Sequence, residues 1–241
     1  LTRCFILMSD SVTYGGLVKI SRYAITFSWG IAGERQILLA TAGNLATSQA
    51  VVSVLSERTK ARDKRSPSIL EAPSMFQVAR TVSQTLAEVI DTSARGQQQA
   101  ESTFSSTFIL GGQIKGGAMR LYLIYPEGNY ITVSEQHPYL QIGETKYGKP
   151  ILDRIIQPDT SPEIAMRCGL LSIDSTMRSN ATVGPPLECL FYRNDSLDGF
   201  QHYIKLEENH PYLTRIRQTW DESIRLAFQQ LPSFTEVFEA D

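Results

Sequence analysis

The chain has 241 residues, of which 42% are hydrophobic and 20% charged, with a formal net charge of −2 at pH 7. This length suits one large domain or two small ones, and the apolar content is enough to bury a sizeable core. The nearly balanced charge argues against general binding to nucleic acid or to a membrane surface, which favour a basic excess. No apolar run reaches the length of a membrane span, so we expect a cytoplasmic protein.

The sequence does not indicate a metal or cofactor site. The three cysteines form no CxxC pair, and Cys168 and Cys189 stand among apolar neighbours, as small core residues do. The three histidines are widely spaced, and two of them precede proline. This dispersion argues against a zinc site and against a Ser-His-Asp triad, so we expect no metal and no cofactor.

The first part of the chain predicts strands followed by a pair of helices. Strands are expected, from the apolar and β-branched runs, at 6–8, 24–29 and 36–42. The last of these is apolar throughout, which indicates burial on both faces. One helix is predicted over 45–57. A second helix is expected to open at Ser74, which forms a capping box with Gln77.

The same order then repeats. Strands are predicted at 106–110, 120–125 and 130–133, separated by glycine turns. Two helices are expected next, the first over 147–156 and the second from Ser161-Pro162 to about 176. Serine at the N-cap with proline in the first helical position is a strong start signal. The chain ends with predicted strands at 187–193 and 202–206 and a helix over 212–230.

This order of elements bears on the fold class. Helices that come in pairs, instead of singly between strands, argue against a doubly wound parallel sheet. Two antiparallel sheets with a pair of helices outside each sheet would satisfy the order. We therefore expect an α+β fold, a four-layer αββα sandwich, in one domain over 1–241 with a C-terminal helix and tail from about residue 211.

Several motifs, in consecutive order, carry a family resemblance. They are the glycine turns Thr41–Thr47 (TAGNLAT) and Gln141–Pro150 (QIGETKYGKP), then Asp174–Asn180 (DSTMRSN) and Val183-Gly184. Together they closely resemble the bacterial proteasome-type peptidases called Anbu (ancestral β-subunit), which are relatives of HslV and the proteasome β-subunits. The resemblance runs from about Leu1 to Pro232. It implies the αββα sandwich of the N-terminal-nucleophile (Ntn) hydrolases.

The resemblance also implies a chemistry. In that family a mature N-terminal threonine attacks the peptide carbonyl, and its own α-amine, with an unperturbed pKa near 8, accepts the proton. An aspartate and a lysine tune the amine, and a glycine N–H binds the oxyanion. By position, Asp10 matches the aspartate and Gly43 the oxyanion glycine. Asn180 matches a residue beside the nucleophile, and Glu144 stands where related subunits place a serine.

Two positions depart from the family pattern. The lysine should fall near Ala24 and Ile25, neither of which can carry charge. Thr2 is a weak candidate for the nucleophile, because only eight residues separate it from Asp10 and the family needs a strand and a turn between them. A better alignment places Leu1 inside the first strand, with the nucleophile upstream of it. Without the family, Asp10 also fits a plain strand-end turn, and Gly43 a plain strand-to-helix turn.

The resemblance implies a proteasome-type threonine peptidase subunit, with impaired catalysis, acting on peptides within a self-assembled ring or open spiral. A non-catalytic assembly or binding subunit with the same fold is the alternative, and an amidase for small amides is a third possibility. We expect the self-assembly surface to include Met75-Phe76 and the apolar stripe from Val51 to Leu55, because large apolar patches normally mark interfaces.

Overall fold

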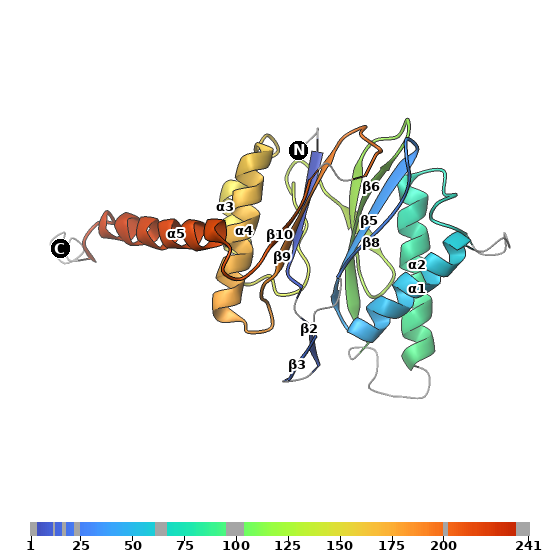
Figure 1. Cartoon of the computed structure of the whole chain (residues 1–241), viewed down its shortest axis with the longest axis horizontal. Helices are drawn as coiled ribbons and strands as arrows, with labels where there is room; N and C mark the ends of the chain where they lie inside the picture. Colours follow the sequence, from blue (N-terminus) through green and yellow to red (C-terminus); the bar gives the residue numbers. More distant parts are fainter. Residues whose placement is uncertain are drawn as a thin grey trace, which may run out of the picture.

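A computed structural model describes residues 4–11, 13–15, 18–21, 25–60, 67–94, 104–199 and 202–234. Two β-sheets face each other at its centre, and helices cover the outer face of each sheet (Figure 1). This arrangement confirms the predicted α+β fold with its helix–sheet–sheet–helix layers. No helix in the described ranges is long and apolar enough to cross a membrane.

Every pair of neighbouring strands is antiparallel. One sheet has the order β4-β5-β6-β7-β8, with strands Thr26–Ile31, Arg35–Gly43, Ser106–Ile114, Arg120–Ile124 and Tyr130–Thr132. The facing sheet has the order β1-β9-β10, with strands Cys4–Ser9, Leu187–Arg193 and His202–Leu206. A small separate hairpin consists of β2 (Thr13–Gly15) and β3 (Val18–Ser21).

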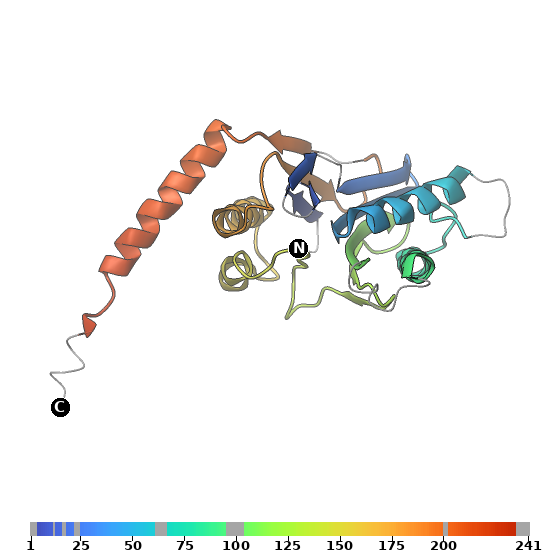
Figure 2. The same ribbon diagram turned by 90° about the horizontal axis from the view of Figure 1, so that it is seen from below.

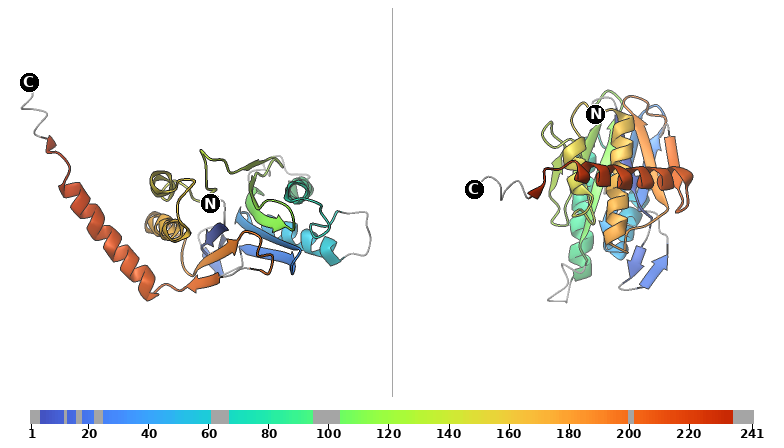
Figure 3. Two further views of the ribbon diagram at one scale, coloured as in Figure 1. Left: turned by 90° about the horizontal axis from the view of Figure 1, so that it is seen from above. Right: turned by 90° about the vertical axis from the view of Figure 1, so that its left-hand side faces the viewer.

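The helices come in pairs on opposite sides of the molecule. Helices α1 (Leu45–Lys60) and α2 (Met75–Ala94) lie on the five-stranded sheet, and α3 (Lys149–Ile155) and α4 (Pro162–Ser179) lie on the three-stranded sheet (Figure 1). The last helix, α5 (Pro211–Gln229), points away from both sheets (Figures 2 and 3). Two of the predicted caps form: Ser74 Oγ accepts from Gln77 N, and Ser161 Oγ accepts from Ile164 N, each at 3.3 Å.

Strand β5 shows why the four residues at 37–40 are all apolar. Ile37 and Leu39 pack in the cluster under α1 and α2, whereas Leu38 and Ala40 pack in the cluster between the two sheets. Because successive side chains point to opposite faces, a strand covered on both sides needs apolar residues at every position. Burial on both faces, as predicted, is confirmed.

Two strand assignments differ from the sequence predictions. The predicted strand at 106–110 continues to Ile114, through two glycines that weaken strand propensity. Here the tertiary structure needs a residue without a side chain, because a Cβ on Gly111 would lie 2.9 Å from Leu121 Cδ2 and 3.3 Å from Phe5 Cζ. The hairpin β2–β3 was also missed, since no strand was predicted between residues 8 and 24.

The prediction that the self-assembly surface lies on the first helix pair is wrong. Val51, Leu55 and Met75 are buried inside the chain itself, where they pack against the five-stranded sheet. Only Phe76 is exposed, at 51%. The large exposed apolar side chains gather instead on α5 and just after it, at Ile224, Leu226, Phe228, Leu231 and Phe234.

Helix α5 is anchored only through its first half. Leu213 is buried in a cluster with residues of α4, β9 and β10. Arg217 Nε lies 2.6 Å from Asp174 Oδ1, and Arg178 of α4 bridges Asp174 and Asp221 at 3.3 and 2.7 Å. From Glu222 to the end of the helix every residue is exposed. Within the described residues, the part of α5 after Asp221 is therefore not covered by other elements.

We expect Asp174→Asn to lower the free energy of unfolding by about 1–3 kcal/mol, because two arginines lose their charged acceptor. The Asp174 side chain is only 7% exposed, so water replaces the lost contacts poorly. Urea denaturation measures the loss. Glu163→Gln is the control, since it removes an exposed pair with Arg167 that should contribute less than about 1 kcal/mol. Equal losses in both variants would contradict the anchoring role of Asp174.

Candidate functional site

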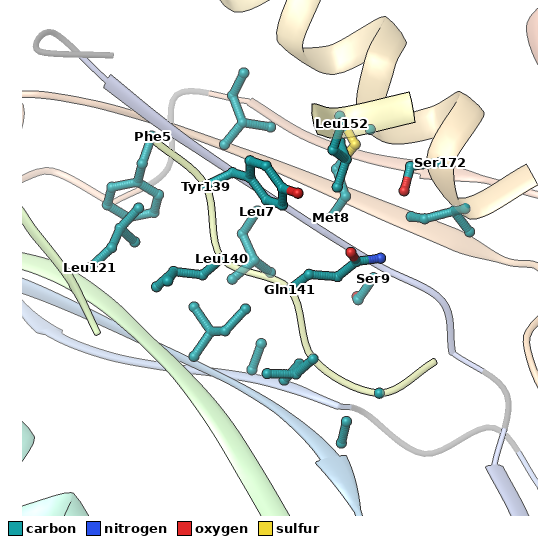
Figure 4. Close-up of a pocket in the computed structure, with 18 of the residues that line it drawn as sticks. Phe5, Leu7, Met8, Ser9, Leu121, Tyr139, Leu140, Gln141, Leu152 and Ser172 are labelled. Carbon is teal, nitrogen blue, oxygen red and sulfur yellow. The ribbon is translucent and has the colours of Figure 1, made fainter. Parts of the chain in front are cut away.

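A cavity of about 860 Å³ lies beside β1. It is lined by β1, by Ile25 just before β4, by the end of β5, by α3 and α4, and by the segment from Val133 to Glu144 (Figure 4). Most of the lining is apolar, and it also includes Asp10, Gly43 and Glu144. The cavity therefore joins residues from four parts of the chain that are distant in sequence.

Asp10 and Gly43 reach this cavity from two different sheets. Asp10 directly follows β1, and its Oδ2 accepts a hydrogen bond from Gly184 N at 3.2 Å. Gly43 is the last residue of β5 and has a φ of 110°. The two residues thus share one cavity, as the resemblance implies for an aspartate and an oxyanion glycine.

Asn180 stands next to the cavity but is not among the residues that line it. It caps the C-terminus of α4, and its Nδ2 donates to Glu144 Oε2 at 3.2 Å. Its Oδ1 accepts from the backbone N and from Oγ1 of Thr182, at 2.9 and 2.7 Å. Asn180 can therefore position Glu144 and Thr182, which do line the cavity.

The turn after Gly43 is tightly fixed. Asn44 caps α1, because its Oδ1 accepts from Thr47 N at 2.9 Å, while Asn44 N donates to Ser105 O at 2.8 Å. Behind it, the hydroxyls of Thr41, Ser48 and Ser106 form a buried hydrogen-bonded group. The N-terminus of α1 adjoins the cavity, since Leu45 and Ser48 line it. A helix N-terminus favours negative charge, which suits a developing oxyanion.

Gly43→Ala should destabilise the fold by about 1–3 kcal/mol. A Cβ there would lie 2.6 Å from Ser105 O, and the φ of 110° disfavours any side chain. Gly33→Ala is the control, because its φ is 69° and nothing lies within 4 Å of the added Cβ. Thermal unfolding of both variants separates the steric clash from the conformational cost. If Gly43→Ala lowers the stability no more than Gly33→Ala does, the expected clash with Ser105 is contradicted.

An uncharged residue, Ile25, stands where the family resemblance places a lysine. Ile25 lines the cavity, and its carbonyl oxygen accepts from Thr41 N at 2.9 Å. Ala24 lies outside the described residues. Within the described ranges, Arg120 is the only Lys or Arg among the residues that line the cavity. The cation that would tune an N-terminal amine is therefore not supplied by Ile25.

Thr2 also lies outside the described residues. Among the described residues, Cys4 begins β1 and Asp10 directly follows the end of that strand.

The thiols of Cys168 and Cys189 fall outside this site. Cys168 and Cys189 are buried, as predicted, and burial raises the pKa of each thiol to about 11. Both thiols are therefore neutral at physiological pH and poor nucleophiles. No group of three or more metal-binding side chains occurs among the residues that the structure describes.

Solved structures similar to this one cover almost the whole chain. Anbu (ancestral β-subunit) from Yersinia bercovieri is 39% identical, with a TM-score of 0.88 over 97% of this chain and 96% of that one. Anbu from Pseudomonas aeruginosa, solved as a helical assembly, is 40% identical, with a TM-score of 0.85 over 95% of this chain and 92% of that one. This chain belongs to the Anbu family.

A third Anbu structure, from Hyphomicrobium sp. strain MC1, is 36% identical, with a TM-score of 0.86 over 96% of this chain and 98% of that one. No protein-family model matches the sequence, and the comparison with curated proteins found no match. The Anbu resemblance inferred from the sequence motifs is confirmed.

The sequence motifs missed two features of the cavity. The motif that contains Gln141 predicts only a glycine turn. In the structure Gln141 lines the cavity, as part of the segment from Val133 to Glu144. The contact between Asn180 and Glu144 was not predicted either, because nothing in the sequence pairs residues 36 positions apart. Both features depend on how the loops fold over the sheet.

Proposed function

We propose that this chain is a proteasome-type Ntn-hydrolase subunit of the cytoplasm, in which the cavity beside β1 is the site of threonine-dependent amide hydrolysis. The observation that carries the proposal is the presence of Asp10 and Gly43 in the lining of one cavity, together with Leu45 and Ser48 of α1. In this role Gly43 N–H stabilises the oxyanion and Asp10 tunes the attacking amine. Asn180 positions Glu144 and Thr182 around them.

The subunit works within an oligomer of identical copies. The support for self-assembly is the exposed apolar surface of α5, together with the helical assembly formed by the Pseudomonas aeruginosa relative. The substrate is a peptide or a small amide, and no metal or cofactor takes part. One domain spans 1–241, and α5 with its tail extends from it.

A non-catalytic assembly or binding subunit is the second candidate function. The uncharged Ile25 in the cavity wall favours it, because an N-terminal amine without a neighbouring cation is poorly tuned as a base at pH 7. The two functions differ in one requirement. Hydrolysis needs a free N-terminal threonine, and binding does not.

The test begins with the protein purified from its native source. Intact mass and N-terminal sequencing identify the mature N-terminus, and a panel of fluorogenic peptides and small amides measures hydrolysis. We expect a mature threonine, and a rate that falls at least about tenfold in Asp10→Asn. Asp159→Asn is the control, because Asp159 is exposed and does not line the cavity. A native protein without an N-terminal threonine and without turnover would favour the binding subunit instead.

A further inference from the structure

Three buried hydroxyl groups meet beside the turn at Gly43. They belong to Thr41 of β5, Ser48 of α1 and Ser106 of β6. Thr41 Oγ1 lies 2.5 Å from Ser48 Oγ, and Ser48 Oγ lies 2.7 Å from Ser106 Oγ. At such distances a proton lies between each pair of oxygens. The three hydroxyls therefore form one hydrogen-bonded group that joins two strands and a helix.

The same hydroxyls reach the backbone on either side of Gly43. Ser106 Oγ lies 3.1 Å from Ala42 O, and Ser48 Oγ lies 3.0 Å from Asn44 O. Each hydroxyl has only one proton to donate. Two arrangements place a proton in both short contacts and also bond a backbone carbonyl: either Ser106 donates to Ala42 O, or Ser48 donates to Asn44 O. In both arrangements Ser106 connects the turn to β6.

The direction of the Gly43 N–H follows from the carbonyl group before it. Ala42 O faces β6, because it lies 3.1 Å from Ser106 Oγ. The Ala42–Gly43 peptide is trans, so its N–H points the opposite way, toward the side of Ile25. Ile25 lies on that side because its carbonyl oxygen accepts from Thr41 N, and N–H groups two residues apart in a strand point the same way. Ile25 and Gly43 both line the cavity.

A glycine in this position needs support from its surroundings. Gly43 has a φ of 110°, and a residue without a side chain restricts the peptide planes beside it less than any other residue does. The turn also stands at the end of β5, where Asn44 N donates to Ser105 O just beyond the strand. Rotation of the Ala42–Gly43 peptide would turn the N–H away from the cavity. The hydroxyl group opposes this rotation, because the contact between Ser106 and Ala42 O would break.

We propose that Ser106, hydrogen-bonded with Thr41 and Ser48, is a positioning residue that holds the Gly43 N–H in its direction toward the cavity. This inference rests on the proposed role of Gly43 as the oxyanion donor. A donor stabilises the oxyanion only from the correct place, and a misplacement of about 1 Å can cost about 10²-fold in rate. Ser106 does not line the cavity itself. It therefore acts through the turn and does not touch the substrate.

The first measurement uses the full chain and needs no turnover. Ser106→Ala should make hydrogen exchange at the Asn44 amide at least about fivefold faster, because the loss of one ordinary hydrogen bond corresponds to about that factor. Ser83→Ala is the matched control: Ser83 is also buried, its hydroxyl donates to the Gly128 carbonyl, and it does not line the cavity. The control should leave this exchange rate unchanged. An unchanged rate in Ser106→Ala would overturn the proposal.

The second measurement is peptide hydrolysis by the protein from its native source. Ser106→Ala should lower kcat at least about fivefold and leave KM unchanged, because the oxyanion forms only after the substrate is bound. Ser83→Ala should change neither. Equal kcat in Ser106→Ala and in the unmodified protein would overturn the proposal, even with faster exchange at Asn44. No turnover by the unmodified protein would contradict the proposed hydrolysis and with it the catalytic use of the contact, while the exchange rates still decide whether Ser106 holds the turn.

Discussion

The chain that begins at Leu1 should hydrolyse fluorogenic peptides at no more than background rate. Ile25 cannot supply the positive charge that tunes an N-terminal amine, although it lines the cavity beside Asp10. Thr2 is a weak candidate for the nucleophile, because the family needs a strand and a turn between the nucleophile and the aspartate, and Asp10 follows Thr2 by only eight positions. Oxyanion donors alone leave only a residual rate, because they cannot supply the attacking group.

Adding a nucleophile and a cation should act cooperatively. Nucleophile, amine and cation work as a unit, so a form with an added N-terminal strand that starts at threonine should show weak turnover at most. The same form with Ile25→Lys should be faster by about 10²-fold or more, which is the usual contribution of a well-tuned base. Ile25→Lys without the threonine strand is the control and should remain at background.

The measurement is a fluorogenic peptide panel with and without an inhibitor that reacts with N-terminal threonine. Thermal unfolding of each form confirms that the lysine is tolerated in the cavity wall. Inhibitor-sensitive cleavage by the unmodified chain would contradict this expectation and would require another nucleophile. Equal rates with and without Ile25→Lys would show that the cation is not limiting.

Charged residues on the apolar face of α5 should separate the subunits. With 100° between successive residues, Leu213, Trp220, Ile224 and Phe228 lie on one side of the helix. Ile224 and Phe228 are 48% and 73% exposed, beyond the point where α4 supports the helix. Burial of each side chain in a partner would stabilise the assembly by about 1.5–3 kcal/mol. Ile224→Asp with Phe228→Asp should therefore weaken each contact by about 10²-fold or more.

Sedimentation velocity measures this change as a shift from a large assembly toward the 26.9 kDa monomer. Gln229→Asp is the control, because it adds a negative charge on the opposite side of α5 and should leave the assembly intact. Dissociation by the control as well would mean that net charge, and not the apolar face, decides the outcome. An unmodified chain that stays monomeric at micromolar concentration would contradict self-assembly itself.

Much of the fold could be predicted from local patterns. Strands β9 and β10 fall at the predicted residues, and Ser74 and Ser161 cap the helices they were expected to open. These features depend on neighbouring residues: side-chain alternation, proline in the first helical turn and hydroxyl caps. The family could be named for a similar reason, because its motifs are short and contiguous.

The site and the surface were decided by tertiary packing. Val51 and Met75 have the same apolar character as Ile224, yet the first two are buried under a sheet and the third is exposed. Periodicity marks which face of a helix is apolar, but it does not say what covers that face. Asp10, Gly43 and Glu144 meet only because two sheets and a closing segment converge. The order β1-β9-β10 brings together strands from the two ends of the chain, and strand order is a long-range property that no local pattern encodes.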